Sequence, residues 1–262
     1  MIDLHCHLLP GIDDGAHSLE ESLDMARCAV DDGITVVACT PHIYPGLYEN
    51  TGAGIRLAIS ALQTALDEAG ISLRLVEGAD VQLALGMRDG LSDGSIPRLA
   101  GSKYFLFEPP HHVAPARLED VAQDLLTAGF VPIVTHPERL SWIEDGYPIM
   151  IRLSEMGCWM QLTAGSITGM FGRRPQYWSE RLLDEGRVHI IATDAHNLRR
   201  RRPVLSEARQ AVARRLGEDA ASDMVLRRPQ GVLDDVTPNS LPATIGRRDE
   251  GGKGMFGLFR GR

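Results

Sequence analysis

The length, composition and charge of the sequence exclude several classes of protein. With 262 residues, of which 44% are hydrophobic and 24% charged, the chain is long enough for one α/β barrel and is not a disordered polymer. The formal net charge of -8 argues against a nucleic-acid partner, because phosphate backbones are bound by basic surfaces.

The first predicted elements are a strand, a helix and a second strand. Residues 1–7 indicate a short strand. Ser18 opens a capping box, and the helix that it begins has its C-cap at Gly33. Residues 34–40 are continuously apolar and rich in β-branched side chains, which is typical of a buried parallel strand.

The same alternation of strand and helix continues to about residue 226. Short apolar runs predict the later strands, and amphipathic segments, several of them ending at glycine, predict the helices. The expected strands cover 73–76, 104–107, 131–135, 158–162 and 188–193. The expected helices cover 53–69, 117–128, 148–156, 175–185, 203–216 and 218–226. This order favours a parallel sheet with helices outside it, closed or nearly closed into a barrel, with an open doubly wound sheet as the alternative.

The domain organisation follows from a change of composition near the C-terminus. No linker divides the first 230 residues, so we predict one catalytic domain over residues 1–234. Residues 235–262 are rich in glycine and arginine. We expect them to form a flexible, basic, glycine-rich C-terminal tail.

Cysteine usage and hydropathy indicate the compartment. The four cysteines are scattered, so a disulfide framework is not expected and a reducing environment fits. No basic segment followed by an apolar stretch marks a signal peptide. No apolar run approaches the roughly 20 residues that span a bilayer. We therefore expect a cytoplasmic protein without a membrane span, and the sequence leaves its oligomeric state open.

Two histidines stand close together in the first predicted strand. His5 and His7 are two positions apart, so their rings point to the same face of a strand and can bind one metal ion. Cys6 points the other way and belongs to the core. A pair of this kind alone is as often structural as metal-binding.

Further histidines and carboxylates lie at the C-terminal ends of the other predicted strands. In an α/β barrel these ends meet at one mouth, where the active site lies. Five of the nine histidines fall at such positions, which favours a shared metal site over isolated structural roles. The residues at these strand ends are His5, His7, His42, Asp80, Glu108, His136, Asp194 and His196.

The types of side chain restrict the metal. Imidazoles and carboxylates without thiolates suit Mn²⁺ best, with iron or zinc as alternatives. The set is too large for one ion, so we expect two or three, with Glu108 placed to bridge. Asp14, on the loop after the first strand, is a further candidate ligand; the alternative for Asp13-Asp14-Gly15 is a simple turn.

These stretches resemble the polymerase-and-histidinol-phosphatase (PHP) superfamily. The resemblance is closer to its bacterial tyrosine-protein phosphatases, which are associated with capsule and exopolysaccharide synthesis. The matching stretches lie within residues 3–203 and are Asp3-Leu4-His5-Cys6-His7, Pro10-Gly11-Ile12-Asp13-Asp14-Gly15, Thr40-Pro41-His42, Gly78-Ala79-Asp80, Glu108, Thr135-His136-Pro137-Glu138-Arg139 and Asp194-Ala195-His196-Asn197.

The resemblance implies a single-domain, distorted TIM-like (β/α)7 barrel with a trinuclear metal site. Arg139 and Arg201 would handle the substrate, and Asp194 or His196 could assist the leaving group. The family usually has Glu where this chain has Asp80, which is one methylene shorter. The implied metal ligands are His5, His7, Asp14, His42, Asp80, Glu108, His136, Asp194 and His196.

The activity that the resemblance implies is metal-dependent hydrolysis of phosphotyrosine. A metal-bound water is ionised near neutrality, and Arg139 can bind phosphate through a bidentate fork. Tyrosine leaves as a phenolate whose pKa is about 10, so a strong general acid is less necessary. The expected partner is a phosphorylated bacterial tyrosine autokinase that controls capsule or exopolysaccharide synthesis.

Other activities remain as alternatives or are disfavoured. A small-molecule phosphatase of the same superfamily, such as histidinol-phosphate phosphatase, would use the same metal ligands. The acidic balance counts against a nuclease of this superfamily. A cysteine-dependent phosphatase is excluded, because no cysteine is followed by arginine six positions later.

Overall fold

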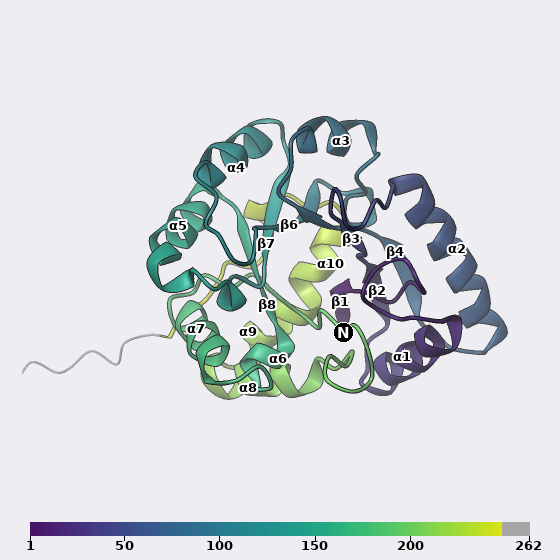
Figure 1. The fold of residues 1–262 in the computed structure, drawn as a ribbon. Coiled ribbons are helices and arrows are strands. Elements are labelled where there is room, and N and C mark those ends of the chain that lie inside the picture. Colours follow the sequence, from purple (N-terminus) through teal and green to yellow (C-terminus); the bar gives the residue numbers. More distant parts are fainter. Residues whose placement is uncertain (248–262) are drawn as a thin grey trace, which may run out of the picture.

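The computed structural model describes residues 1–247, in which the strands form a ring with helices around it (Figure 1). The strands are β1 (Ile2–Cys6), β2 (Val36–Cys39), β3 (His42–Ile43), β4 (Arg74–Glu77), β5 (Asp80–Gln82), β6 (Tyr104–Glu108), β7 (Val131–Thr135), β8 (Trp159–Thr163) and β9 (Ile190–Ala192). The α-helices are α1 (Leu19–Asp31), α2 (Gly52–Glu68), α3 (Met87–Asp93), α4 (Leu118–Thr127), α5 (Ile143–Met156), α6 (Ala164–Ile167), α7 (Arg173–Asp184), α8 (Ser206–Leu216), α9 (Glu218–Ser222) and α10 (Arg228–Leu233).

The strands close into a barrel. All pairings between them are parallel, in the orders β1-β2-β4 and β3-β5-β6-β7-β8-β9. β2 and β3 are two halves of one interrupted strand, and so are β4 and β5. The ring closes between β1 and β9, where the His7 amide donates to the Ala195 carbonyl at 2.9 Å. Within residues 1–247 the barrel thus has seven strands, which confirms the distorted (β/α)7 barrel over the open sheet.

Alternate side chains of each strand point into the barrel. On β6, Tyr104 and Leu106 belong to the inner apolar cluster, and Glu108 is the next residue on that face. On β8, Trp159 belongs to the same cluster and Gln161 follows. The period of two therefore fills the barrel with apolar side chains and leaves polar ones at the mouth.

The first strand departs from this alternation. Between Asp3 and Cys6, β1 has one residue more than the facing part of β2. Such a bulge reverses which side chains face inward. Leu4 packs in the inner cluster, and His5 and His7 nevertheless share the mouth, where their rings meet. Cys6 is buried in the outer cluster, as expected.

Two apolar clusters hold the barrel together. The larger one fills the space between the strands and the surrounding helices, and the smaller one fills the barrel itself. Helix α10, which lies across the middle of the ring in Figure 1, contributes Val232 to the inner cluster and so closes the end of the barrel opposite the mouth. Among the helices of residues 1–247, none is long and apolar enough to cross a membrane.

Helices α6 and α10 fall outside the helices expected from the sequence, and two others also differ from the expectation. Helix α5 begins at Ile143, before the expected start at residue 148. Proline is common in the first turn of a helix, whereas Pro148 lies inside this one. Helix α3 was not expected. It has seven residues between Gly86 and Gly94, both at a φ of 78°, and is too short to show helical periodicity.

The segment after α10 also differs from the flexible tail expected from residue 235. The Tyr104 hydroxyl donates to the Val236 carbonyl at 2.7 Å. The buried Arg228 guanidinium donates to the Pro242 carbonyl at 2.9 Å. Residues 235–247 are thereby held against the barrel through backbone acceptors, which composition does not reveal. The rest of the expected tail lies outside the described residues.

Candidate metal centre

The barrel mouth brings all nine expected ligands together. They form overlapping groups of three or four, and within each group the potential ligand atoms lie within 4.8 Å of one another. The groups are His7, Asp14, His42 and His196; His5, His7 and Asp80; His5, His136 and Asp194; and His42, Asp80 and Glu108.

The deepest group surrounds the two histidines of β1. The Nε2 atoms of His5 and His7 lie 3.2 Å apart, and each lies 3.4 Å from Asp194 Oδ1. His5 Nε2 also lies 3.4 Å from Asp80 Oδ2. Two atoms bound at about 2.0–2.2 Å to one ion lie roughly 3.0–3.6 Å apart in octahedral or tetrahedral geometry. The separations therefore match those of atoms that share an ion.

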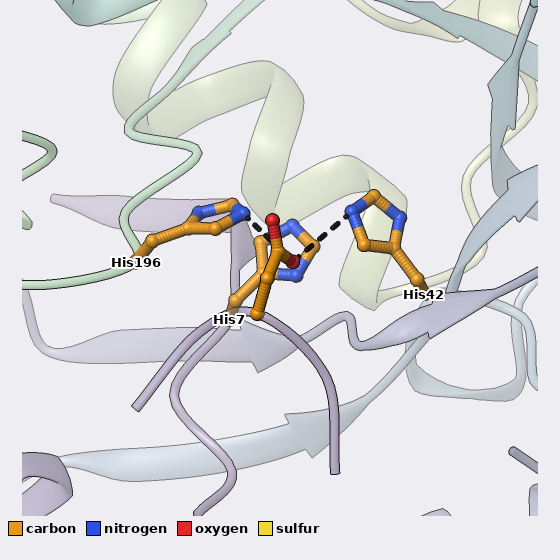
Figure 2. Close-up of side chains that lie close together, drawn as sticks. His7, His42 and His196 are labelled. Carbon is orange, nitrogen blue, oxygen red and sulfur yellow. Dashed lines mark ion pairs between the residues drawn. The ribbon is translucent and has the colours of Figure 1, made fainter. Parts of the chain in front are cut away.

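A second group lies nearer to solvent. Asp14 Oδ1 is 3.5 Å from His42 Nε2 and 3.4 Å from His196 Nε2. Figure 2 shows His42 and His196 directed toward each other from opposite sides, with His7 between them. The Asp14 side chain is 48% exposed, so this group is the accessible edge of the centre.

Glu108 connects two further histidines. Its Oε2 atom lies 3.7 Å from His42 Nδ1, and its Oε1 atom lies 3.8 Å from His136 Nε2. Asp80 Oδ2 lies 3.5 Å from the same His42 nitrogen. Because the two Glu108 oxygens face different rings, this carboxylate has the arrangement that bridging two ions requires.

Several buried polar atoms at the mouth have no hydrogen-bond partner among the described residues. They are both carboxylate oxygens of Asp80, Nδ1 of His42, Nδ1 of His136 and Nε2 of His196. A buried polar atom without a partner costs about 1–3 kcal/mol. Bound divalent cations would offset this cost for the atoms that face them, so the residues present fit a metal cluster.

The electrostatics of the mouth point the same way. Burial, together with the charges of Asp80 and Asp194, holds the pKa of Glu108 well above its usual range. Burial also lowers the pKa of His136, and it lowers that of His196 to about 4. Both rings are therefore neutral at pH 7, the form that binds metals. Cations among these groups would relieve the repulsion between the carboxylates.

Two of the nine residues have a strained backbone. His136 has a φ of 34° and Asp194 a φ of 51°, both in the left-handed region that non-glycine residues rarely occupy. His136 directly follows the end of β7, and Asp194 lies two residues after the end of β9. Strain of this kind persists where the surrounding structure fixes it, and it is concentrated at functional sites.

Two supporting residues were not identified as such from the sequence. His7 Nδ1 donates to Asp13 Oδ2 at 2.7 Å, and His5 Nδ1 donates to Gln161 Oε1 at 2.9 Å. Both contacts leave Nε2 free for a metal and fix the ring. The signal that could have found Gln161 is its place two residues after Trp159, at an inward position near the end of a strand.

The two arginines expected to handle substrate lie on one carboxylate. Arg201 Nη2 is 2.5 Å from Asp194 Oδ2, and Arg139 Nη1 donates to the same oxygen. The other oxygen of Asp194 faces His5 and His7. The Arg139 guanidinium also lies over the Phe171 ring, 5.1 Å from its centroid. Both guanidiniums therefore stand at the edge of the candidate metal centre.

The remaining four histidines belong to none of these groups. His111 and His112 lie in the loop after β6, and His17 is exposed on the loop before α1. His189 stacks on Trp159 near the barrel end that α10 covers.

Fold and centre together define a class of protein. An α/β barrel whose strand ends gather imidazoles and carboxylates has the architecture and donor set of a metal-dependent hydrolase. A family model described as capsular polysaccharide synthesis, CpsB/CapC, matches residues 1–234. The chain belongs to the CpsB/CapC family, which confirms the resemblance to the capsule-associated tyrosine phosphatases.

Relatives and solved structures agree with this family. The tyrosine-protein phosphatase YwqE of Bacillus subtilis (strain 168) is 34% identical over 219 residues, covering 84% of this chain and 86% of YwqE. The tyrosine-protein phosphatase CpsB of Streptococcus pneumoniae is 26% identical over 240 residues, covering 90% of this chain and 99% of CpsB. One solved structure matches with a TM-score of 0.87 at 33% identity, over 90% of this chain and 96% of the matched chain. It comes from crystal structures of YwqE from Bacillus subtilis and CpsB from Streptococcus pneumoniae, which are described as unique metal-dependent tyrosine phosphatases.

A more distant structure shares the fold alone. The dihydropyrimidinase of Brevibacillus agri matches with a TM-score of 0.53 at 12% identity, over 94% of this chain and 73% of its own. This likeness supports the barrel architecture and says nothing of the substrate.

Proposed function

We propose that this chain is a metal-dependent phosphatase that releases phosphate from phosphotyrosine in a protein substrate. The observation that carries the proposal is the convergence of nine donor side chains and two arginines at one barrel mouth. The names of YwqE and CpsB, both tyrosine-protein phosphatases, support it.

The proposed centre holds two or three ions. The absence of thiolates from its groups favours Mn²⁺, with iron or zinc as alternatives. When bound, the ions would supply a water of lowered pKa as nucleophile and would neutralise phosphoryl charge. The proposed ligands are His5, His7, Asp14, His42, Asp80, Glu108, His136, Asp194 and His196.

The chain's own side chains position the reacting groups. Arg139 and Arg201 both contact Asp194 at one side of the centre. Their remaining N–H donors can bind phosphoryl oxygens through bidentate forks. Asp194 and His196 lie at the same edge and are proposed to assist proton transfer to the leaving oxygen. A phenolate leaving group with a pKa of about 10 requires little such help.

We further propose that the substrate is a phosphorylated tyrosine autokinase in the cytoplasm. The description of the family, capsular polysaccharide synthesis, supports a partner that acts in that process. The alternative, a histidinol-phosphate phosphatase, would use the same metal chemistry, but none of the relatives named above favours it.

The test compares two substrates on the purified full chain. Hydrolysis of a phosphotyrosine peptide and of histidinol phosphate is measured with Mn²⁺ and then with excess chelator. Release from the peptide that the chelator abolishes, and that Arg139→Gln reduces strongly, supports the proposal. The matched control is Arg152→Gln, which breaks an ion pair with Glu119 between helices α5 and α4. A preference for histidinol phosphate would refute the tyrosine assignment and keep the metal centre.

A further inference from the structure

The loop after His196 concentrates positive charge beside the proposed centre. Residues 197–202, here called the arginine loop, contain four consecutive arginines in a chain whose net charge is -8. Arg199, Arg200 and Arg202 are exposed. Within residues 1–247, none of these three has a carboxylate oxygen within 4 Å, although Arg201 has one.

Several arginines elsewhere on the surface are neutralised by neighbours. Arg174 pairs with Glu144 at 2.5 Å, and Arg215 pairs with Asp184 at 2.6 Å. Arg199 and Arg200 therefore leave a local surplus of positive charge on a molecule that is acidic overall, whereas Arg202 shares a hollow with the acidic side chains of Asp24, Asp31, Asp32 and Glu207. Such a surplus attracts a negatively charged partner to that place.

The backbone of the arginine loop is fixed. Asn197 Oδ1 accepts hydrogen bonds from the amides of Arg199 and Arg200, both at 3.0 Å. The Arg201 carbonyl accepts a hydrogen bond from the His196 amide at 2.9 Å. Because the loop is already ordered, a partner would have to immobilise only the guanidinium side chains, which reduces the entropic cost of binding.

The arginine loop is continuous with the proposed phosphate site. Arg201 and Arg202 line a hollow together with Glu207 and with Met170 and Phe171, which belong to the loop between α6 and α7. The Phe171 ring in turn contacts Arg139. A substrate whose phosphate lies between the two phosphate-binding arginines would therefore extend its neighbouring residues over the arginine loop.

We propose that the arginine loop selects phosphotyrosine sites flanked by acidic side chains. This inference rests on the proposed function of the centre. Aspartate or glutamate beside the phosphotyrosine would pair with Arg199 or Arg200, which have no carboxylate within 4 Å among residues 1–247. A protein segment fits better than an anionic membrane, because a short segment meets only the local positive charge, whereas an extended negative surface also faces the rest of a chain whose net charge is -8.

The experiment uses two phosphotyrosine peptides that differ only in flanking Glu or Gln residues. For the wild-type chain with Mn²⁺, kcat/KM is expected to be roughly five- to ten-fold higher for the acidic peptide and to fall toward equality as salt is raised. The double substitution Arg199→Gln and Arg200→Gln should bring this ratio close to one. The matched control is Arg214→Gln, an exposed arginine on α8 that has no carboxylate within 4 Å among residues 1–247 and should keep the wild-type ratio.

The outcomes separate the inference from the proposed function. A wild-type ratio of one, or a preference that survives the double substitution, would overturn the inference while leaving the phosphatase intact. Arginine-dependent binding to anionic vesicles with a peptide ratio of one would assign the loop to a lipid surface and equally overturn it. If neither peptide is hydrolysed, the proposed function fails, and fluorescence anisotropy of the two peptides then decides whether the loop prefers the acidic one.

Discussion

His7 Nδ1 donates a hydrogen bond to Asp13 Oδ2 at 2.7 Å, and the same ring directs its Nε2 atom toward Asp194 Oδ1, 3.4 Å away. Asp13 thus fixes both the orientation and the tautomer of a candidate ligand. It also accepts from the amides of Gly15 and His42, at 2.9 and 3.2 Å. One carboxylate therefore connects the loop after β1 to two ligand-bearing strands.

Removing this carboxylate should weaken metal binding without removing a ligand. Asp13→Asn is expected to raise the Mn²⁺ concentration for half-maximal activity roughly 10- to 100-fold, because His7 loses its charged acceptor. Titration of the apo-enzyme with Mn²⁺ measures this shift. Asp24→Asn, an exposed carboxylate that pairs with Arg27 on α1, is the control. An Asp13→Asn titration that coincides with the control would contradict the role of Asp13.

The overlap of the groups predicts unequal losses of metal. Asp80 belongs to two of them, with His5 and with His42, whereas Asp14 belongs to one. Asp80→Asn should therefore reduce the bound metal by more than one equivalent, and Asp14→Asn by at most one. Elemental analysis of the desalted variants gives the metal content per chain. Equal losses would show that Asp80 is not shared between ions.

Much of the barrel could be predicted from the sequence. Apolar β-branched runs and glycine helix ends mark the strands and helices, and Glu108 and Asp194 stand at strand ends, where a barrel places its active site. The bulge in β1 could not be predicted, because one extra residue does not change the composition of the run. Its effect is to place both His5 and Leu4 inside the barrel.

The supporting contacts were less visible for a different reason. In the sequence, Asp13 can be explained as an ordinary turn residue, and Gln161 as an ordinary polar residue within a strand. Their functions depend on which histidine nitrogen lies opposite them, and this is a property of the closed barrel. The docking of residues 235–247 likewise depends on backbone acceptors that meet the Arg228 side chain only after folding.

A partly buried histidine far from the centre predicts acid sensitivity. Burial, and next the charge of Arg228, lowers the pKa of His189 to about 3, and its Nδ1 accepts from the Met160 amide at 3.1 Å. Because the folded pKa lies below the unfolded value of about 6.5, the stabilising contribution is complete above pH 6.5 and declines as the pH falls toward 3. A pH of 4.5 lies about two units below the unfolded pKa, so the free energy of unfolding should have fallen by roughly 2–3 kcal/mol at that pH.

His189→Gln should remove this sensitivity, because Gln keeps an acceptor and does not titrate. The free energy of unfolding, measured by urea at pH 7 and pH 4.5 with chelator present, should fall by roughly 2 kcal/mol less than in the wild type. His17→Gln, an exposed histidine, is the control and should follow the wild type. The same decrease in wild type and His189→Gln would rule out this imidazole as the titrating group.

The last prediction concerns the aromatic ring beneath Arg139. The guanidinium carbon lies 5.1 Å from the centroid of the Phe171 ring, a contact of about 0.5–1 kcal/mol at a partly exposed site. Phe171→Leu keeps an apolar side chain but removes the ring face. Inorganic phosphate should then bind the Mn²⁺-loaded protein roughly two- to five-fold more weakly, as measured by titration calorimetry.

Two further variants identify the cause of such a loss. Phe130→Leu is the matched control, because Arg98 lies 5.6 Å from the Phe130 ring beside the start of β7, at the opposite end of the barrel. It should leave phosphate affinity unchanged. In an Arg139→Ala background, Phe171→Leu should cause no additional loss, since the guanidinium through which it acts is gone. An additional loss of the same size would mean that Phe171 affects phosphate binding by a route other than Arg139.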